Sequence, residues 1–319
     1  MSDSHHILII DEVHPVLLDM LKDYLVIYRP HITLVDLEVA IHDATILIVR
    51  SKLYLDASWL EKAPNLRAIG RLGSGMDNID TQYAEELNIA CFNAPEGNRN
   101  AVAEQTVGMM LGLLANINKG HHEIRNGIWN RKGNEGLELA NLCVGIIGYG
   151  NVGRELAAKL ASFGCKILAY DLYASGFDSV HVQEVSLKEI QEQADVLSLH
   201  VPLNKASEAL VNKQFIETMK KPFYLLNLSR GKVCVLSDII GGLESKKIRG
   251  AALDVLPNEQ LATFTENEKK ELAYLVGNNA VILTPHIGGL TKDSFEQLAK
   301  VLGNKILNWI ETGPLVNPK

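Results

Sequence analysis

A single histidine, His286, lies between a proline and two glycines in the stretch LTPHIGG, residues 283–289. The apolar run AVIL, residues 280–283, leads into this stretch, so His286 is expected where a buried strand ends. Imidazole titrates near neutral pH, and a histidine placed there can take up or release a proton during a reaction. A lone histidine in a loop can equally make only structural hydrogen bonds, so its interpretation depends on the residues that the fold brings beside it.

A second chemical pattern is GYGNVG, in which Gly148, Gly150 and Gly153 have the spacing of a dinucleotide-binding turn. An apolar strand precedes this turn, and an amphipathic helix follows it. We expect the helix to end at Gly164 and a second strand to run to Asp171. The glycines would allow a tight turn, close approach of a pyrophosphate, and packing of the helix on the strand. The N-terminus of that helix would offer N–H groups to the phosphates. Asp171 would accept hydrogen bonds from ribose hydroxyls and repel a 2′-phosphate, so we expect NAD rather than NADP.

Reactive side chains follow other predicted strands of the same half of the chain, namely Arg230, Asp254, Glu259 and His286. Ligands of open α/β sheets bind beyond the carboxyl ends of the strands, so we expect these groups in one cleft. His286 would take the hydroxyl proton when an alcohol is oxidised, and the neighbouring Glu259 would favour the protonated imidazole. Arg230 can bind a carboxylate through two bonds and polarise an adjacent carbonyl. The set predicts hydride transfer on a 2-hydroxy acid, with Asp254 bonded to the nicotinamide amide.

Short apolar runs alternate with helical stretches, such as residues 16–25, along nearly the whole chain. The predicted strands are residues 7–10, 46–49, 68–69, 89–92, 143–147, 166–170, 196–201, 223–228, 250–253 and 281–283. Continuous apolar strands separated by helices are typical of parallel sheets covered on both faces. The sequence therefore predicts an α/β protein with two doubly wound parallel-sheet units. Between them, residues 101–125 predict one long apolar helix, of the kind that is buried between domains or subunits.

The composition is that of a globular protein, and its 319 residues suggest two domains. A net charge of −7 argues against a nucleic-acid surface, and no apolar run reaches the ~20 residues of a membrane span. The N-terminus lacks the pattern of a signal peptide. Four cysteines without CxxC spacing predict buried free thiols in a reducing compartment, and the cytoplasm is the expected location. These cysteines are Cys91, Cys143, Cys165 and Cys234.

The chain resembles the D-isomer-specific 2-hydroxyacid dehydrogenases in six motifs that follow that family's order and spacing. They are RLGSGMDNID (71–80), NAPEGNRNAVAE (93–104), GIIGYGNVG (145–153), NLSRGKV (227–233), ALDVLPNE (252–259) and TPHIGG (284–289). The resemblance implies that Arg230, Glu259 and His286 are the catalytic residues. It also implies a Rossmann-type cofactor domain, residues 99–291, inserted into a flavodoxin-like substrate domain made of residues 1–98 and 292–319. The long helix after Asn100 resembles the family's dimer contact, so a homodimer or a dimer of dimers is expected.

The motifs and the resemblance together give a set of expected contacts. The cofactor contacts are Gly148, Tyr149, Gly150, Asn151, Val152, Gly153, Asp171, Val201, Pro202, Leu228, Ser229, Arg230, Asp254, His286, Gly288 and Gly289. The substrate contacts are Arg50, Ser51, Ser74, Gly75, Asn98, Arg131, Arg230 and His286, with Ser74 and Gly75 as a backbone clamp for the carboxylate. Ala101, Val201 and Leu256 depart from the family's usual residues, and none of them removes a catalytic group. No metal is expected, and His200 is open to two interpretations, support of the cofactor motif or simple packing at a strand end.

The substrate is predicted from two further motifs, LIVRSK (47–52) and NGIWNR (126–131), which resemble segments of phosphoglycerate dehydrogenases. Arg50, Arg71 and Arg131 would neutralise the phosphate of 3-phosphoglycerate or 3-phosphohydroxypyruvate, with Lys52 as a further candidate. This predicts a role in serine biosynthesis. Because the chain ends near residues 314–316, no C-terminal regulatory domain is expected. The alternatives are a glyoxylate/hydroxypyruvate reductase, a D-lactate dehydrogenase, or an NAD(H)-sensing corepressor-like protein without turnover.

Overall fold

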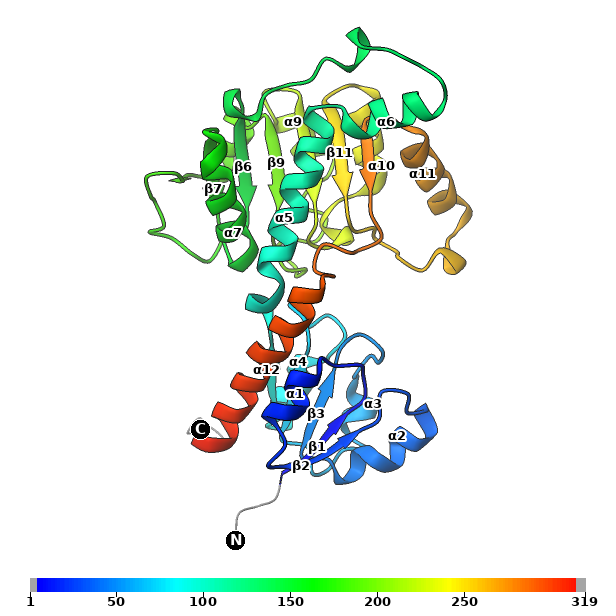
Figure 1. Ribbon diagram of the computed structural model, residues 1–319, viewed down its shortest axis with the longest axis vertical. Coiled ribbons are helices and arrows are strands. Elements are labelled where there is room, and N and C mark those ends of the chain that lie inside the picture. The colour runs from blue at the N-terminus through cyan, green and yellow to red at the C-terminus, as the bar shows by residue number, and fades with distance from the viewer. Residues whose placement is uncertain (1–4, 314–319) are drawn as a thin grey trace. The chain divides into compact units, whose positions relative to one another are not determined.

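The computed structural model describes residues 5–313 and divides into two compact units (Figure 1). The first consists of Met1–Asn98 and Leu290–Lys319, and the second of Arg99–Gly289. Residues 314–316, on which the prediction about a regulatory domain rests, lie outside the described residues. In the described part of the chain, no helix is both long enough and apolar enough to cross a membrane.

The first unit contains a five-stranded parallel sheet in the order β2-β1-β3-β4-β5. Along β1, Ile7 and Ile9 pack with helices α1 and α12, whereas Leu8 and Ile10 pack into the core on the opposite face. Because both faces are covered, the strand has no polar alternation. The strands are β1 His6–Ile9, β2 Leu25–Tyr28, β3 Ile46–Val49, β4 Ala68–Arg71 and β5 Ala90–Asn93. The helices are α1 Pro15–Met20, α2 Leu34–Ala40, α3 Ala57–Leu60, α4 Thr81–Glu86 and α12 Lys292–Thr312.

The second unit contains a seven-stranded parallel sheet in the order β12-β11-β10-β9-β6-β7-β8. The strand order reverses beside β6, which is where ligands bind in open α/β sheets. The strands are β6 Cys143–Ile147, β7 Lys166–Tyr170, β8 Gln183–Glu184, β9 Val196–Leu199, β10 Phe223–Asn227, β11 Ile248–Leu253 and β12 Val281–Leu283. The helices are α5 Pro95–Leu114, which starts in the first unit, α6 Ile117–Arg125, α7 Asn151–Leu160, α8 Leu187–Gln193, α9 Lys213–Thr218, α10 Leu236–Glu244 and α11 Glu266–Gly277.

Both units are doubly wound parallel sheets, so the predicted fold class is confirmed. Strands β3, β6, β7 and β12 have the predicted bounds. The sequence analysis missed β2, although its residues LVIY form an apolar run, because it assigned Leu25 to the amphipathic stretch before it. The prediction of one amphipathic stretch over residues 16–25 was therefore wrong: α1 ends at Met20. β8 was also missed, since it consists of only two polar residues.

The single helix predicted over residues 101–125 is in fact two helices, α5 and α6. Asn116 breaks the helix between them with a φ of 54°, a left-handed conformation that asparagine tolerates better than most residues. Its side-chain amide donates to the carbonyl oxygen of Glu135 at 3.1 Å. From Val102 to Leu114, α5 lies across one face of the seven-stranded sheet and is buried in its core, whereas α6 has no buried residue (Figure 1).

All four cysteines are free thiols. Cys143, Cys165 and Cys234 are buried as predicted, and Cys91 is half-buried. Burial raises the pKa of Cys234 to about 12 and that of Cys91 to about 11. These thiols are therefore protonated and unreactive near neutral pH.

A glycine in the first turn of α5, Gly97, allows this helix to pack closely on α12. A Cβ on Gly97 would lie 2.7 Å from the backbone of Leu298, which cannot move without shifting α12. A Cβ on Gly303 would meet side chains instead, the flexible end of Met20 at 2.7 Å and a methyl group of Leu17 at 3.2 Å. We expect Gly97→Ala to destabilise the first unit by about 2 kcal/mol through overpacking. Gly303→Ala, its matched control, should change stability by less than about 0.5 kcal/mol. Urea unfolding followed by tryptophan fluorescence measures both, and equal effects would contradict the close packing.

Candidate active site

The glycine-rich turn lies between β6 and α7. Gly148 has a φ of +94°, and a Cβ on this residue would lie 2.3 Å from the carbonyl oxygen of His200, so only glycine fits. A Cβ on Gly153 would lie 2.1 Å from the carbonyl oxygen of Gly148, which explains the close approach of α7 to the turn. Gly150 is the N-cap of α7, and no side chain caps the helix there. The N–H groups of its first turn are therefore left to bind an anion such as a pyrophosphate.

Asp171 is tied to this turn from the end of β7. Its Oδ2 accepts a hydrogen bond from the Tyr149 N–H at 2.7 Å, and its Oδ1 accepts from the N–H groups of Tyr173 and Ala174 at 2.9 and 3.0 Å. A carboxylate has about four acceptor positions, so Oδ2 keeps one for a ribose hydroxyl. The Tyr149 ring stacks on Phe177 at 4.3 Å between centroids, which fixes the loop after β7 against the turn. These residues fit an adenosine ribose and its pyrophosphate.

Other predicted cofactor contacts surround the same turn. Asn151 and Val152 begin α7, and the Val201 side chain reaches within 3.0 Å of where a Cβ on Gly148 would stand. Pro202 is exposed, and its carbonyl oxygen accepts a hydrogen bond from the Ser207 hydroxyl at 2.5 Å. Leu228 and Ser229 are buried directly after β10. The structure thus places these residues at the carboxyl ends of β6, β9 and β10.

Arg230 follows in a loop shaped by Asn227, a buried residue that the sequence analysis did not single out. The Asn227 Oδ1 accepts from the Ser229 N–H at 3.0 Å and from its hydroxyl at 2.8 Å, and its Nδ2 donates to the Arg230 carbonyl oxygen at 2.9 Å. A Cβ on Gly231 would lie 2.0 Å from the carbonyl carbon of Leu256. This close approach packs the arginine loop against the loop that leads to Glu259.

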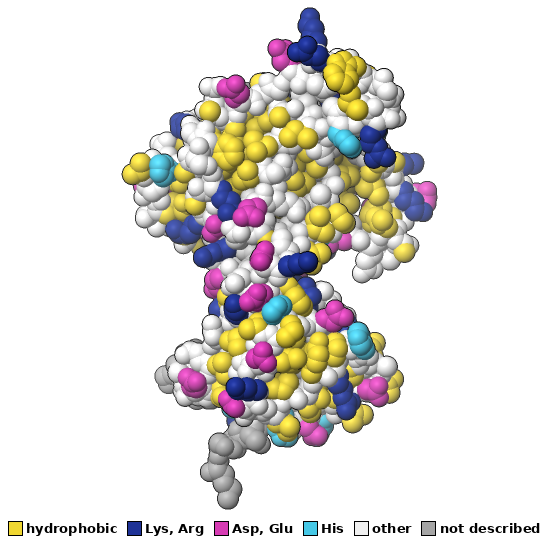
Figure 2. Space-filling model, in the orientation of Figure 1, with side chains coloured by type: hydrophobic (Ala, Val, Ile, Leu, Met, Phe, Trp, Pro, Cys, Tyr) yellow, Lys and Arg dark blue, Asp and Glu magenta, His cyan; other side chains and the backbone are white. Residues whose placement is uncertain are grey.

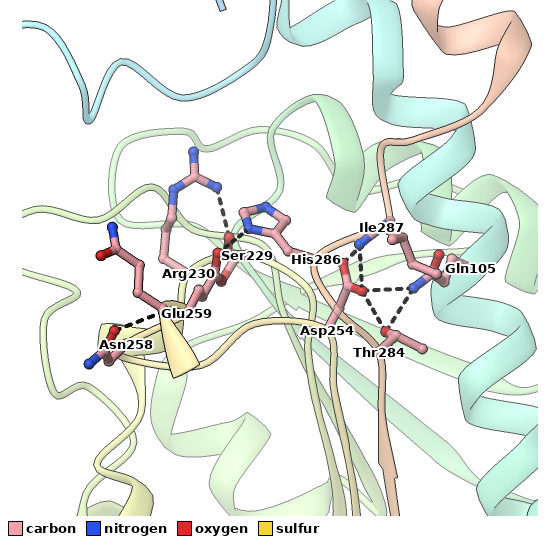
Figure 3. A network of polar contacts seen from close by, with 11 residues as sticks. Gln105, Ser229, Arg230, Asp254, Asn258, Glu259, Thr284, His286 and Ile287 are labelled. Atoms are coloured by element: carbon pink, nitrogen blue, oxygen red, sulfur yellow. Dashed lines mark hydrogen bonds and ion pairs between the residues drawn. The ribbon is translucent and has the colours of Figure 1, made fainter. Parts of the chain in front are cut away.

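His286 and Glu259 form the predicted pair. The Nδ1 of His286 lies 2.9 Å from Oε2 of Glu259, and the side chains are 46% and 44% exposed, so solutes can reach both. A proton on Nδ1 is shared with the carboxylate, which leaves Nε2 as the ring nitrogen that can exchange a proton with a ligand. Figure 3 shows Arg230, Glu259 and His286 together on neighbouring loops, with the half-buried arginine donating to the Ser229 carbonyl oxygen at 2.7 Å.

Asp254 makes most of its hydrogen bonds within the protein. The residue is only 1% exposed, and its carboxylate accepts hydrogen bonds from Gln105, Thr284, Ile287 and Gly288 (Figure 3). These bonds shape the loop that carries His286, and they leave one acceptor position on Oδ2 unused. Gln105 was missed by the sequence analysis. Its sequence offers no clear signal, because Gln105 lies between two other polar residues, Glu104 and Thr106.

The predicted substrate residues of the first unit follow its strands. Arg50, directly after β3, donates its N–H to Oδ2 of Asp11 at 2.5 Å, and its guanidinium lies 5.1 Å from the ring centroid of Phe295. The Ser74 hydroxyl donates to Oδ1 of Asn98 at 2.5 Å. Ser51 is exposed and Gly75 is half-buried. The structure thus brings Ser74 and Asn98 into direct contact and holds Arg50 through its backbone and its stacking.

The other cations differ in their surroundings. The Arg71 side chain folds over Gly73, where a Cβ would lie 1.7 Å from Nη1. Lys52 donates to the carbonyl oxygens of Pro30 and Ile32 at 3.1 and 2.9 Å, so it stabilises a loop of the first unit. Arg131 is exposed in the second unit, at the start of a short 3₁₀ segment. Residues 5–313 contain no group of three histidine, cysteine or acidic side chains arranged to hold a metal.

Comparisons with known proteins identify similar sequences and similar folds. A family model described as D-isomer specific 2-hydroxyacid dehydrogenase, NAD binding domain, matches residues 107–288. The D-3-phosphoglycerate dehydrogenase of Methanocaldococcus jannaschii is 35% identical over 269 residues, 83% of this chain and 50% of that protein. The hydroxypyruvate reductase of Thermotoga maritima is 33% identical over 287 residues, 90% of this chain and 92% of that protein.

The solved structures give the same picture for the whole fold. A D-lactate dehydrogenase from Aquifex aeolicus, complexed with NAD and lactic acid, matches with a TM-score of 0.85 and 25% identity, over 98% of this chain and 100% of that one. This chain spans about half the length of the first curated relative. The predicted cofactor is confirmed, since the matched domain is an NAD-binding domain.

His200 packs beneath the glycine turn, where its Nε2 lies 2.8 Å from the Ser198 hydroxyl. Burial lowers the pKa of His200 from 6.5 to about 4. Unfolded chains therefore bind the proton first, so this residue stabilises the fold above pH 6.5, and the stabilisation is lost as the pH falls towards 4. Between pH 7 and pH 5, we expect the free energy of unfolding to fall by about 2 kcal/mol more in the wild type than in His200→Gln. Urea unfolding at both pH values measures this, and parallel pH profiles would contradict a buried neutral imidazole.

Proposed function

The chain belongs to the D-isomer-specific 2-hydroxyacid dehydrogenases, and from this premise we propose that it is an NAD-dependent oxidoreductase acting on a D-2-hydroxy acid and its 2-keto acid. The observation that carries the proposal is the exposed pair of His286 and Glu259, 2.9 Å apart, beside the loop of Arg230. This pair supplies a proton donor and acceptor, and the arginine supplies a binding group for a carboxylate.

His286 moves the proton in this reaction. With Nδ1–H donated to Glu259, Nε2 accepts the proton of the substrate hydroxyl during oxidation and returns it to the carbonyl oxygen during reduction. Glu259 fixes the tautomer and stabilises the imidazolium that forms. NAD, when bound, accepts the hydride in one direction and, as NADH, donates it in the other. Arg230 holds the substrate carboxylate and polarises the adjacent carbonyl.

The cofactor is held by the residues around the glycine turn. The free N–H groups at the start of α7 bind the pyrophosphate, and the open acceptor position of Asp171 binds the adenosine ribose. The last position on Oδ2 of Asp254 accepts from the nicotinamide carboxamide. We assign the cofactor domain to residues 99–291 and the substrate domain to residues 1–98 and 292–319.

For the substrate we propose 3-phosphoglycerate and 3-phosphohydroxypyruvate, which would place the enzyme in serine biosynthesis. Two arginines of the first unit support a dianionic substrate: Arg50 is stacked on Phe295, and Arg71 lies over Gly73. Ser74 and Asn98, already hydrogen-bonded to each other, would bind the acid end. The second candidate is a hydroxypyruvate reductase, favoured by a relative of that name whose length this chain covers to 92%.

The assembly we propose is a homodimer in the cytoplasm. Large apolar side chains are exposed on α6 and the segment after it, among them Trp129, which is 80% exposed. Figure 2 shows hydrophobic side chains at the surface over this part of the second unit. An exposed apolar surface of this kind is typical of a protein interface. The other exposed apolar side chains of this surface are Ile117, Ile124, Ile128 and Leu137.

The proposed reaction is tested by following NADH absorbance with 3-phosphohydroxypyruvate, hydroxypyruvate, glyoxylate and pyruvate. We expect the wild type to turn over at least the first. His286→Gln should lower kcat by about 10²–10⁴-fold, because proton transfer is lost, while NADH affinity measured by fluorescence changes by less than about twofold. His181→Gln, an exposed histidine of the same unit, is the control. NADH binding without turnover of any acid would support a binding protein and overturn the enzyme assignment.

The phosphate role of Arg50 is tested by comparing two substrates that differ in that group. We expect Arg50→Leu to raise KM for 3-phosphohydroxypyruvate by about 30-fold, because charge-assisted bonds to the phosphate are lost. KM for hydroxypyruvate should stay within about twofold. Arg29→Leu, an exposed arginine of the same unit, is the control. Equal changes for both substrates, or a wild-type preference for hydroxypyruvate, would favour the reductase.

A further inference from the structure

We propose that Gln105 is a positioning residue, whose side-chain amide holds the Asp254–Thr284 pair and thereby keeps the loop of His286 in its reactive shape. Its Nε2 donates to Oδ1 of Asp254 at 3.0 Å and to Oγ1 of Thr284 at 3.1 Å. The Thr284 hydroxyl donates to the same Asp254 oxygen at 2.5 Å. Figure 3 shows this triangle of side chains, which come from α5, from the end of β11 and from the end of β12. The inference rests on the proposed function.

The triangle controls His286 through Asp254. The main-chain oxygen of Asp254 accepts the His286 N–H at 2.7 Å, and its carboxylate accepts the N–H groups of Ile287 and Gly288 at 2.9 and 2.8 Å. Three consecutive amides of the loop therefore point at one residue. Any rotation of the Asp254 side chain would release two of them.

The His286 backbone needs this support because its φ is +54°. A non-glycine residue in the left-handed region costs of order 1 kcal/mol and persists only where the surrounding contacts require it. The strained position also turns the ring towards Glu259. A loop that relaxed to an ordinary φ would break the pairing of Nδ1 with the carboxylate.

The Asp254 carboxylate, in turn, depends on its donors. It is 1% exposed, and a buried carboxylate is tolerated only when it is hydrogen-bonded. In the described part of the chain, the side-chain donors to it are Gln105 and Thr284. Gln105 donates to both partners at once, so it fixes the orientation of the Thr284 hydroxyl as well as that of the carboxylate.

The test compares variants of the full-length protein. Gln105→Leu removes the donor at similar volume, and we expect kcat to fall about tenfold while KM and NADH affinity stay within about twofold. Thr284→Val should have the same effect, Thr284→Ser should keep wild-type kcat, and the double variant Gln105→Leu/Thr284→Val should fall no further than either single variant. Thr106→Val is the matched control, because this buried neighbour on α5 loses only a bond to the Val102 carbonyl oxygen.

A second readout does not depend on turnover. The ring signals of His286 in the cofactor-free protein, assigned by NMR with His286→Gln, should shift in Gln105→Leu and stay in place in Thr106→Val. Unchanged His286 signals, or an equal fall of kcat in Thr106→Val, would overturn the inference. If the wild type reduces none of the tested acids, the proposed function fails, and the NMR comparison alone then decides whether Gln105 positions His286.

Discussion

The Asp254 carboxylate accepts hydrogen bonds from Ile287, Gly288, Thr284 and Gln105, and its carbonyl oxygen accepts the N–H of His286. This one buried group joins the ends of two neighbouring strands to helix α5. It supports the left-handed conformation of His286, whose N–H also donates to the Thr284 carbonyl oxygen at 3.0 Å. The geometry of the His286–Glu259 pair thus depends on a residue that is itself almost inaccessible to solvent.

The parallel sheet of the second unit explains why the reactive groups gather. Its strands end at one edge, so the loops after β6, β7, β9, β10, β11 and β12 all lie there. Close backbone approaches at Gly148 and Gly231 then pack these loops against one another, at His200 and Leu256 respectively. Asn227 and Asp254 each use a polar side chain to shape the loop that follows. The site is accordingly fixed by buried polar groups and glycines, while its reactive atoms stay accessible.

In the proposed function, substrate choice depends on different residues from those that perform the chemistry. The proposed roles of Arg230, Glu259 and His286 suit any 2-hydroxy acid, because these residues would contact only its carboxylate and hydroxyl. A phosphate at the far end of the substrate needs added cations, and Arg50, which lies over the ring of Phe295, is the one that we propose. Lys52 does not add to them, since it binds two backbone carbonyls. The similar proteins act on different acids according to their names, which include a phosphoglycerate dehydrogenase, a hydroxypyruvate reductase and a lactate dehydrogenase. This agrees with a substrate choice that is separate from the shared fold.

The sequence by itself determined the features that depend on local residue patterns. These are the buried parallel strands, the glycine turn, and the residues that follow each strand. It also paired Glu259 with His286, because both follow neighbouring strands. Only the tertiary structure decided the rest. The break between α5 and α6 involves a left-handed Asn116 whose side chain bonds to Glu135, a residue of another segment. Gln105 meets Asp254 across 149 residues and Thr284 across 179, and no periodicity or spacing records contacts between elements so far apart in the chain.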